Sequence, residues 1–138
     1  MKMFFVLDAC ALIAFLNDEP GAEKVEHLLR LSATEDTQLV MHKINLLEIY
    51  YDTYRAKGKD VADEMLKAVR RLPIIVDDSL DDNIFFESAR LKATYKISLA
   101  DSIALALSVT RKASIVTADH HEFDKIEKKE KILFEWIR

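Results

Sequence analysis

Four carboxylates in this chain stand in apolar sequence, where an unpaired charge is costly. They are Asp8, Glu48, Asp101 and Asp119, in the contexts FFVLDACAL, INLLEIYYD, ISLADSIAL and SIVTADHHEF. Buried or clustered carboxylates must be protonated, paired with a cationic side chain or bound to a metal cation. No lysine or arginine lies beside three of the four in the sequence. A divalent metal site is therefore the first hypothesis that these residues suggest.

Each of the four also has a purely structural alternative. Asp8 and Asp119 follow expected strands, where ligands of open α/β sheets bind, but aspartate is also a good helix N-cap. For Asp8 the ligand-site and helix-cap interpretations are equally well supported. For Asp119 the polar neighbours favour a plain turn. Ser98-x-x-Asp101 before an apolar run has the form of a capping box. Glu48 lies inside an expected helix, and taken singly it is most simply a solvent-facing glutamate.

Two other kinds of site have little support. His120 and His121 suggest zinc, but adjacent histidines are poor shared ligands, and no cysteine or third histidine has zinc spacing. Exposed loop residues are the simpler account of this pair. Cys10 is the single cysteine, so an intrachain disulfide is excluded. No histidine near it in the sequence would activate the thiol as a nucleophile.

Composition limits the class of protein. The chain has 138 residues, of which half are apolar, and a net charge of −4. This fits one domain over residues 1–138 and does not suggest nucleic-acid binding driven by overall charge, although a local basic face is compatible with it. The apolar run at 3–7 is too short for a secretion signal, and no segment approaches the ~20 apolar residues of a membrane helix. We expect a soluble, cytoplasmic protein without a membrane anchor.

Strands and helices alternate along the chain, which predicts an α/β fold with a mostly parallel sheet. Short apolar runs predict five strands, at residues 3–7, 38–41, 74–76, 114–117 and 132–136. Helical spacing predicts helices at 9–16, from Pro20 through Leu29, from Ile44 to Gly58, at 61–69, from Ser79 through Leu91, and from Ser98 through Val109. Ser79-x-x-Asp82 is expected to cap its helix and nothing more.

Taken together, the four acidic contexts resemble the PIN-domain nucleases, especially the VapC-type toxins of prokaryotic toxin–antitoxin pairs. The resemblance runs from VLDACALIAFL through NLLEIYY and SLADSIALALS to IVTADHHEF. It implies a three-layer PIN-like fold, with a five-stranded sheet flanked by helices and the four acids at one end. It also implies that Asp8, Glu48, Asp101 and Asp119 bind Mg²⁺ or Mn²⁺ and catalyse RNA hydrolysis.

The same resemblance assigns supporting roles. It matches Thr117 to a hydroxyl residue of the family's T-x-D turn and makes Asn45, one turn before Glu48, a supporting residue of the site. Cys10 stands where members often have serine, and Glu122 stands where some have a further acid. The resemblance implies an RNA substrate, an antitoxin partner and a homodimer, to which Tyr50, Tyr51 and Tyr54 would contribute contact area. Candidates for the RNA backbone are Arg55, Lys57, Lys59, Arg70 and Arg71, although ordinary surface charge explains each more simply.

Three alternatives remain at this stage. A phosphoacceptor receiver domain also uses a doubly wound sheet, acids and Mg²⁺, but it needs an acidic pair after the first strand, where this chain has Asp8 alone. A haloacid dehalogenase-type phosphohydrolase needs a second acid at the position of Cys10. A non-catalytic PIN-like scaffold that binds a protein partner is disfavoured by the complete set of four acids.

Overall fold

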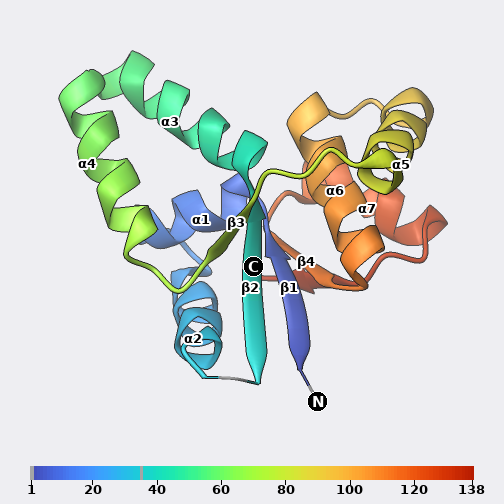
Figure 1. Cartoon of the computed structure of the whole chain (residues 1–138), viewed down its shortest axis with the longest axis horizontal. Coiled ribbons are helices and arrows are strands. Elements are labelled where there is room, and N and C mark those ends of the chain that lie inside the picture. Colours follow the sequence, from blue (N-terminus) through green and yellow to red (C-terminus); the bar gives the residue numbers. More distant parts are fainter. Residues whose placement is uncertain (1, 35) are drawn as a thin grey trace.

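The computed structural model describes residues 2–34 and 36–138, and in this part of the chain five strands form one sheet (Figure 1). The sheet has the order β3-β2-β1-β4-β5, and every neighbouring pair is parallel. The predicted mostly parallel sheet is thus parallel throughout. Its strands are β1 (Met3–Leu7), β2 (Thr37–His42), β3 (Ile75–Asp77), β4 (Ser114–Thr117) and β5 (Phe134–Trp136).

Helices cover both faces of the sheet, which gives the three layers that were predicted (Figure 1). Along β1, Phe5 and Leu7 pack against the helices of one face and Val6 against those of the other. A strand buried on both sides needs apolar residues in succession, which explains the continuous run at 3–7. One layer contains α1 (Ala9–Leu16), α2 (Ala22–Ser32), α3 (Lys43–Lys57) and α4 (Lys59–Arg70), and the other contains α5 (Asp82–Thr94), α6 (Leu99–Arg111) and α7 (His120–Lys129).

The starts of α2 and α5 differ from the sequence prediction. α2 begins at Ala22 rather than Pro20, after Gly21 in the left-handed region with φ of 98°. A Cβ at Gly21 would lie 2.7 Å from the Ile137 carbonyl oxygen, so a larger residue fits neither the conformation nor the space. α5 begins at Asp82 and is capped by Asp81, which accepts a hydrogen bond from the Ile84 amide. The predicted Ser79–Asp82 capping box is therefore wrong.

α7 was not predicted from the sequence. Its ten residues carry a buried apolar pair, Phe123 and Ile126, among charged neighbours. One pair at a spacing of three is too weak a periodic signal to distinguish a helix from a charged loop. The helix is stabilised instead by an N-cap and by packing against the sheet.

The strand order reverses at β1 and β4, because the chain adds β2 and β3 on one side of β1 and places β4 and β5 on the other. In open parallel sheets, a crevice forms at such a switch point beyond the carboxyl ends of the strands. The residues after Leu7 and Thr117 consequently lie where a ligand site is expected. No helix in the described residues has the length and apolar character needed to cross a membrane.

Candidate active site

Asp8 and Asp119 lie at the carboxyl ends of the two strands that flank the switch point. Asp8 follows β1 directly, and its carboxylate caps α1 by accepting a hydrogen bond from the Ala11 amide at 2.8 Å. Asp119 caps α7 by accepting from the Glu122 amide at 3.1 Å, so it starts a helix rather than a plain turn. Each of these hydrogen bonds uses one carboxylate oxygen. The structural and the functional interpretations of these aspartates are therefore compatible with each other.

Glu48 and Asp101 come from two helices that pack against each other, α3 and α6. Asp101 lies in the first turn of α6, and its amide donates to the hydroxyl of the N-cap Ser98 at 3.0 Å. Asn45 is fully buried, and its Nδ2 donates to the Ala100 carbonyl oxygen at 3.5 Å. This contact ties α3 to the start of α6, and Glu48 lies one turn further along α3.

A cavity of about 310 Å³ brings three of the four predicted acids together, because Glu48, Asp101 and Asp119 all line it. Asp8 is buried, with 1% of its surface exposed, and its carboxylate interacts electrostatically with Asp101 and Asp119. The four acids thus occupy one region although they are separated by up to 111 positions in the chain (119 − 8 = 111).

The lining of this cavity includes two acids that sequence reasoning missed, Glu19 and Asp52. Asp52 stands four residues after Glu48, so it lies on the same face of α3, and this spacing was a usable signal. Glu19 follows the end of α1, and no local pattern indicates that the chain turns back to the site. Its carboxylate is near Arg138, whose Nη1 lies 3.6 Å from Glu19 Oε1.

Three of the acids have raised pKa values. Burial raises the pKa of Asp8 to about 7, opposed by hydrogen bonds from Thr117 and the Ala11 amide and reinforced by Asp101 and Asp119. Burial, followed by repulsion from Asp119, raises the pKa of Asp101 to about 6. Burial also raises the pKa of Glu48, with Asp101 and Asp52 adding to the effect. Close carboxylates in a poorly solvated site account for all three shifts.

Helix ends partly offset this repulsion. α1, α6 and α7 all begin at the site, at the N-caps Asp8, Ser98 and Asp119. The N-terminus of a helix carries a partial positive charge, which stabilises nearby anions. The fold therefore favours negative charge at this position through its backbone, before any cation is considered.

Thr117, predicted to support the site, is fully buried at the end of β4. Its hydroxyl accepts from the Asp119 amide at 3.0 Å and also lowers the pKa of Asp8 through a hydrogen bond. One hydroxyl thus contacts both aspartates at the switch point. Asn45 has a distinctive feature as well, since its buried Oδ1 has no hydrogen-bond partner among the described residues.

Cys10 and the two histidines offer no second chemistry. Burial, followed by the charge of Asp8, raises the pKa of the Cys10 thiol to about 11, so almost no thiolate forms at neutral pH. His120 stacks on Trp136 with ring centroids 3.8 Å apart, and its two ring nitrogens contact Asp124 and the Arg138 carbonyl oxygen. Both ring nitrogens of His120 are thus occupied by structural contacts, while His121 is exposed beside it.

The donor set suits a hard divalent cation. Carboxylate oxygens are the ligands of Mg²⁺ and Mn²⁺, and acids with raised pKa values gain most from a neighbouring positive charge. The unpartnered Asn45 Oδ1 adds a buried oxygen one turn before Glu48. As the side chains stand, no three histidine, cysteine or acidic side chains of the described residues are arranged as ligands of one ion.

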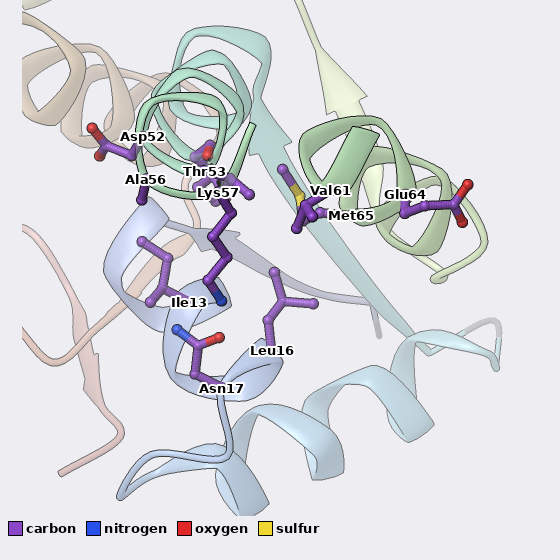
Figure 2. Close-up of a pocket in the computed structure, with 11 residues that line it drawn as sticks. Ile13, Leu16, Asn17, Asp52, Thr53, Ala56, Lys57, Val61, Glu64 and Met65 are labelled. Atoms are coloured by element: carbon purple, nitrogen blue, oxygen red, sulfur yellow. Dashed lines mark hydrogen bonds between the residues drawn. The ribbon is translucent and has the colours of Figure 1, made fainter. Parts of the chain in front are cut away.

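A second cavity adjoins the acidic one (Figure 2). It measures about 530 Å³, lies between α1, α3 and α4, and is lined by apolar side chains that include Leu16, Val61 and Met65. Ile13, Ile49 and Asp52 line both cavities, so the two are contiguous. A mainly apolar groove thus leads directly to the carboxylates.

The family model of the PIN domain matches residues 5–129, which includes all four predicted acids. The chain belongs to the PIN domain family. Membership of this family leaves the receiver and haloacid dehalogenase alternatives without support. No curated protein matches this PIN-domain chain.

Solved structures with the same fold agree with this assignment. VapBC-1 from nontypeable Haemophilus influenzae superposes with a TM-score of 0.74 at 18% identity, covering 98% of each chain. VapBC2 from Rickettsia felis was solved with a DNA fragment from its promoter. It superposes with a TM-score of 0.73 at 16% identity, covering 97% of this chain and 98% of that one. A toxin–antitoxin complex from Klebsiella pneumoniae superposes with a TM-score of 0.62 at 19% identity, covering 88% of this chain and 91% of that one.

Proposed function

We propose that this PIN-domain protein, as a single domain over residues 1–138, is a metal-dependent ribonuclease and the toxin of a toxin–antitoxin pair. The observation that carries the proposal is the grouping of Asp8, Glu48, Asp101 and Asp119 at the switch point of a PIN fold, with three raised pKa values. Acids kept close together at a cost in stability are typical of functional sites.

The four acids would hold Mg²⁺ or Mn²⁺, which supplies Lewis acidity to a phosphodiester and a nucleophilic water at neutral pH. The residues of the chain position these ligands. Asp8 and Asp119 are fixed by their helix caps and by the Thr117 hydroxyl. Asn45 holds α3 against α6 and thereby sets the approach of Glu48 toward Asp101.

A protein partner and self-association complete the proposal. Two of the structural relatives are VapBC assemblies, and a third is a toxin–antitoxin complex. We propose that an antitoxin covers the acidic cavity and packs on the adjoining apolar groove. Tyr51 and Tyr54 are exposed on α3 and remain candidates for a homodimer contact. Tyr50 donates a hydrogen bond to Asp63 at 2.6 Å and so already joins α3 to α4.

The test is cleavage of single-stranded and structured RNA with Mg²⁺ or Mn²⁺, repeated after chelation. Cleavage should require the ion and should leave a 3′-hydroxyl and a 5′-phosphate. Undiminished cleavage in chelator would overturn the metal mechanism. Stable binding of a partner without any RNA cleavage, under conditions in which the protein is folded, would instead support the non-catalytic scaffold.

A further inference from the structure

A basic groove lies beside the acidic cavity. It measures about 520 Å³ and runs between α7 and the segment that joins α5 to α6. Three lysines line it, Lys96 from the joining segment and Lys125 and Lys129 from α7. His121 also lines it, and Glu122 is the one acid among the lining residues that the structure describes. The charge of this groove is opposite to that of the chain as a whole, which is −4.

In the described part of the chain, the three lysines form no ion pairs. Across residues 2–34 and 36–138, none of them has a carboxylate oxygen within 4.0 Å of its ammonium nitrogen. Other lysines of this protein do pair, at 3.1 Å for Lys24 and 2.7 Å for Lys59. Like charges that share a groove without counter-ions repel, and an anionic ligand would remove that cost.

Two short stretches of chain link the groove to the candidate active site. Lys96 precedes by two positions Ser98, which lines the acidic cavity, and His121 follows Asp119 by two positions. The carboxylate of Glu122, in the groove lining, acts electrostatically on Asp101 in the acidic cavity. A polymer bound at the four acids can therefore extend onto the lysines.

We propose that Lys96, Lys125 and Lys129 bind phosphates of the RNA strand next to the bond that is cut. This inference rests on the proposed ribonuclease function and deepens it. An acidic site repels a polyanion, so affinity for RNA must come from local cations around it. Lysine binds phosphate as a point charge and reads no base, so the groove supplies affinity and register without sequence preference.

The basic residues selected from the sequence fit this role less well. Arg55 lies 3.9 Å from Asp52, and Lys59 lies 2.7 Å from Asp63. Lys57 lines the apolar groove between α1, α3 and α4. The lysines at 96, 125 and 129 were not singled out because one lies in a loop and the others in a charged stretch, and only the fold brings them together.

The experiment compares two triple variants of the full chain that carry the same change in charge. The test variant is Lys96→Ala/Lys125→Ala/Lys129→Ala. The control is Lys92→Ala/Lys128→Ala/Lys131→Ala, which removes three exposed lysines outside the groove lining. Lys128 and Lys129 are neighbours in the last turn of α7, so both variants lose one favourable charge at the same helix end. Thermal melting establishes that both are folded.

The first measurement is binding of a fluorescent single-stranded homopolymeric RNA in chelator, as a function of salt. Loss of three phosphate contacts should lower the slope of log affinity against log salt by about 2 relative to the control. The second measurement is cleavage with Mg²⁺, in which the test variant should raise KM while kcat changes little, because binding lost equally from substrate and transition state affects KM alone.

Equal salt slopes and equal KM values for the two variants would overturn the groove as the RNA site, even if the wild type cleaves RNA. A test variant that loses affinity for an acidic protein partner but not for RNA would also overturn it. A wild type that binds RNA through the groove yet never cleaves it would support the groove and refute the ribonuclease proposal. Different results would therefore refute the RNA-binding groove and the ribonuclease function.

Discussion

The candidate active site and the contact between α5 and α7 contain the same kind of side chain in opposite electrostatic states. At the α5–α7 contact, Glu130 accepts hydrogen bonds from the Arg90 guanidinium at 2.7 Å and from the Tyr95 hydroxyl at 2.6 Å. These two hydrogen bonds hold the pKa of Glu130 below its usual range. At the switch point, burial and neighbouring acids raise the pKa values of Asp8, Asp101 and Glu48.

The comparison distinguishes a contact that stabilises the fold from a cluster of acids that lowers its stability. The Glu130 contact is arranged so that each charge has a partner, and it holds two helices together. The switch-point acids face one another, and helix N-termini and the Thr117 hydroxyl offset only part of their repulsion. A fold selected for stability alone would not gather these acids, whereas a cation-binding site requires such a grouping.

The largest expected effect is on catalysis. Asp8→Asn, Glu48→Gln, Asp101→Asn and Asp119→Asn should each reduce RNA cleavage by more than about 100-fold, beyond the loss typical of groups that only orient metal ligands. Double variants should be scarcely worse than single ones, because the ligands act as a unit. Glu130→Gln is the matched control and should retain cleavage. Initial rates with Mg²⁺ test this, and full activity in any one of the four would remove that residue from the site.

The two regions should also respond to pH in opposite directions. The folded pKa of Asp8, about 7, exceeds its ordinary value of 3.8, so the folded protein binds more protons than the unfolded chain between these values. The stability that results is present below the ordinary pKa and is lost as pH rises through about 7. For Glu130, whose pKa is lowered from 4.5, the stability is present above that value and is lost as pH falls.

Urea unfolding in chelator, across a series of pH values, measures both slopes. Between pH 4 and pH 7, Asp8→Asn should flatten the decline of the unfolding free energy by on the order of 2 kcal/mol. Glu130→Gln should leave that decline unchanged. It should instead reduce the loss of unfolding free energy that occurs as pH falls below the ordinary pKa of glutamate. An unaltered pH profile in Asp8→Asn would mean that this carboxyl is not strained by burial.

A smaller effect is expected from relieving repulsion without disturbing a cap. Asp119→Asn keeps a good N-cap residue on α7 and removes one charge from the acidic cavity, so it should stabilise the metal-free protein by about 1 kcal/mol. Mg²⁺ should raise the melting temperature of the wild type more than that of the variant, since it binds the folded arrangement. A wild type that melts higher without metal and ignores Mg²⁺ would show that the acids do not form one site.

The smallest effect should come from Cys10→Ser. The thiol stays protonated at neutral pH because its pKa is about 11, and the serine hydroxyl is a neutral group of similar size. Cleavage and melting temperature should therefore match the wild type. Inactivation by this substitution would restore a chemical role for the sulfur.

Sequence patterns predicted the bounds of a strand or helix correctly where the residues that stabilise it lie within or next to the segment itself. Residues 3–7 and 9–16 were predicted with the observed bounds, because a doubly buried strand, an aspartate cap and an apolar helix follow one another. α7 escaped prediction because its stability comes from a cap and two buried side chains. The involvement of Glu19 in the cavity depends on how the chain turns back after α1, which no local pattern encodes, whereas the spacing of Glu48 and Asp52 was a local signal.

The parallel pairing of β1 with β4 has a consequence for the synthesis of this protein. The pairing joins residues 5–7 to residues 114–116, so Asp8 meets Asp119 only after most of the chain has left the ribosome. Domains fold as units during synthesis, from the N-terminus onward. A growing or prematurely terminated chain therefore has no complete acidic site. If the site cleaves RNA, as proposed, the messenger RNA that encodes the chain is exposed to that activity only after translation has passed Asp119.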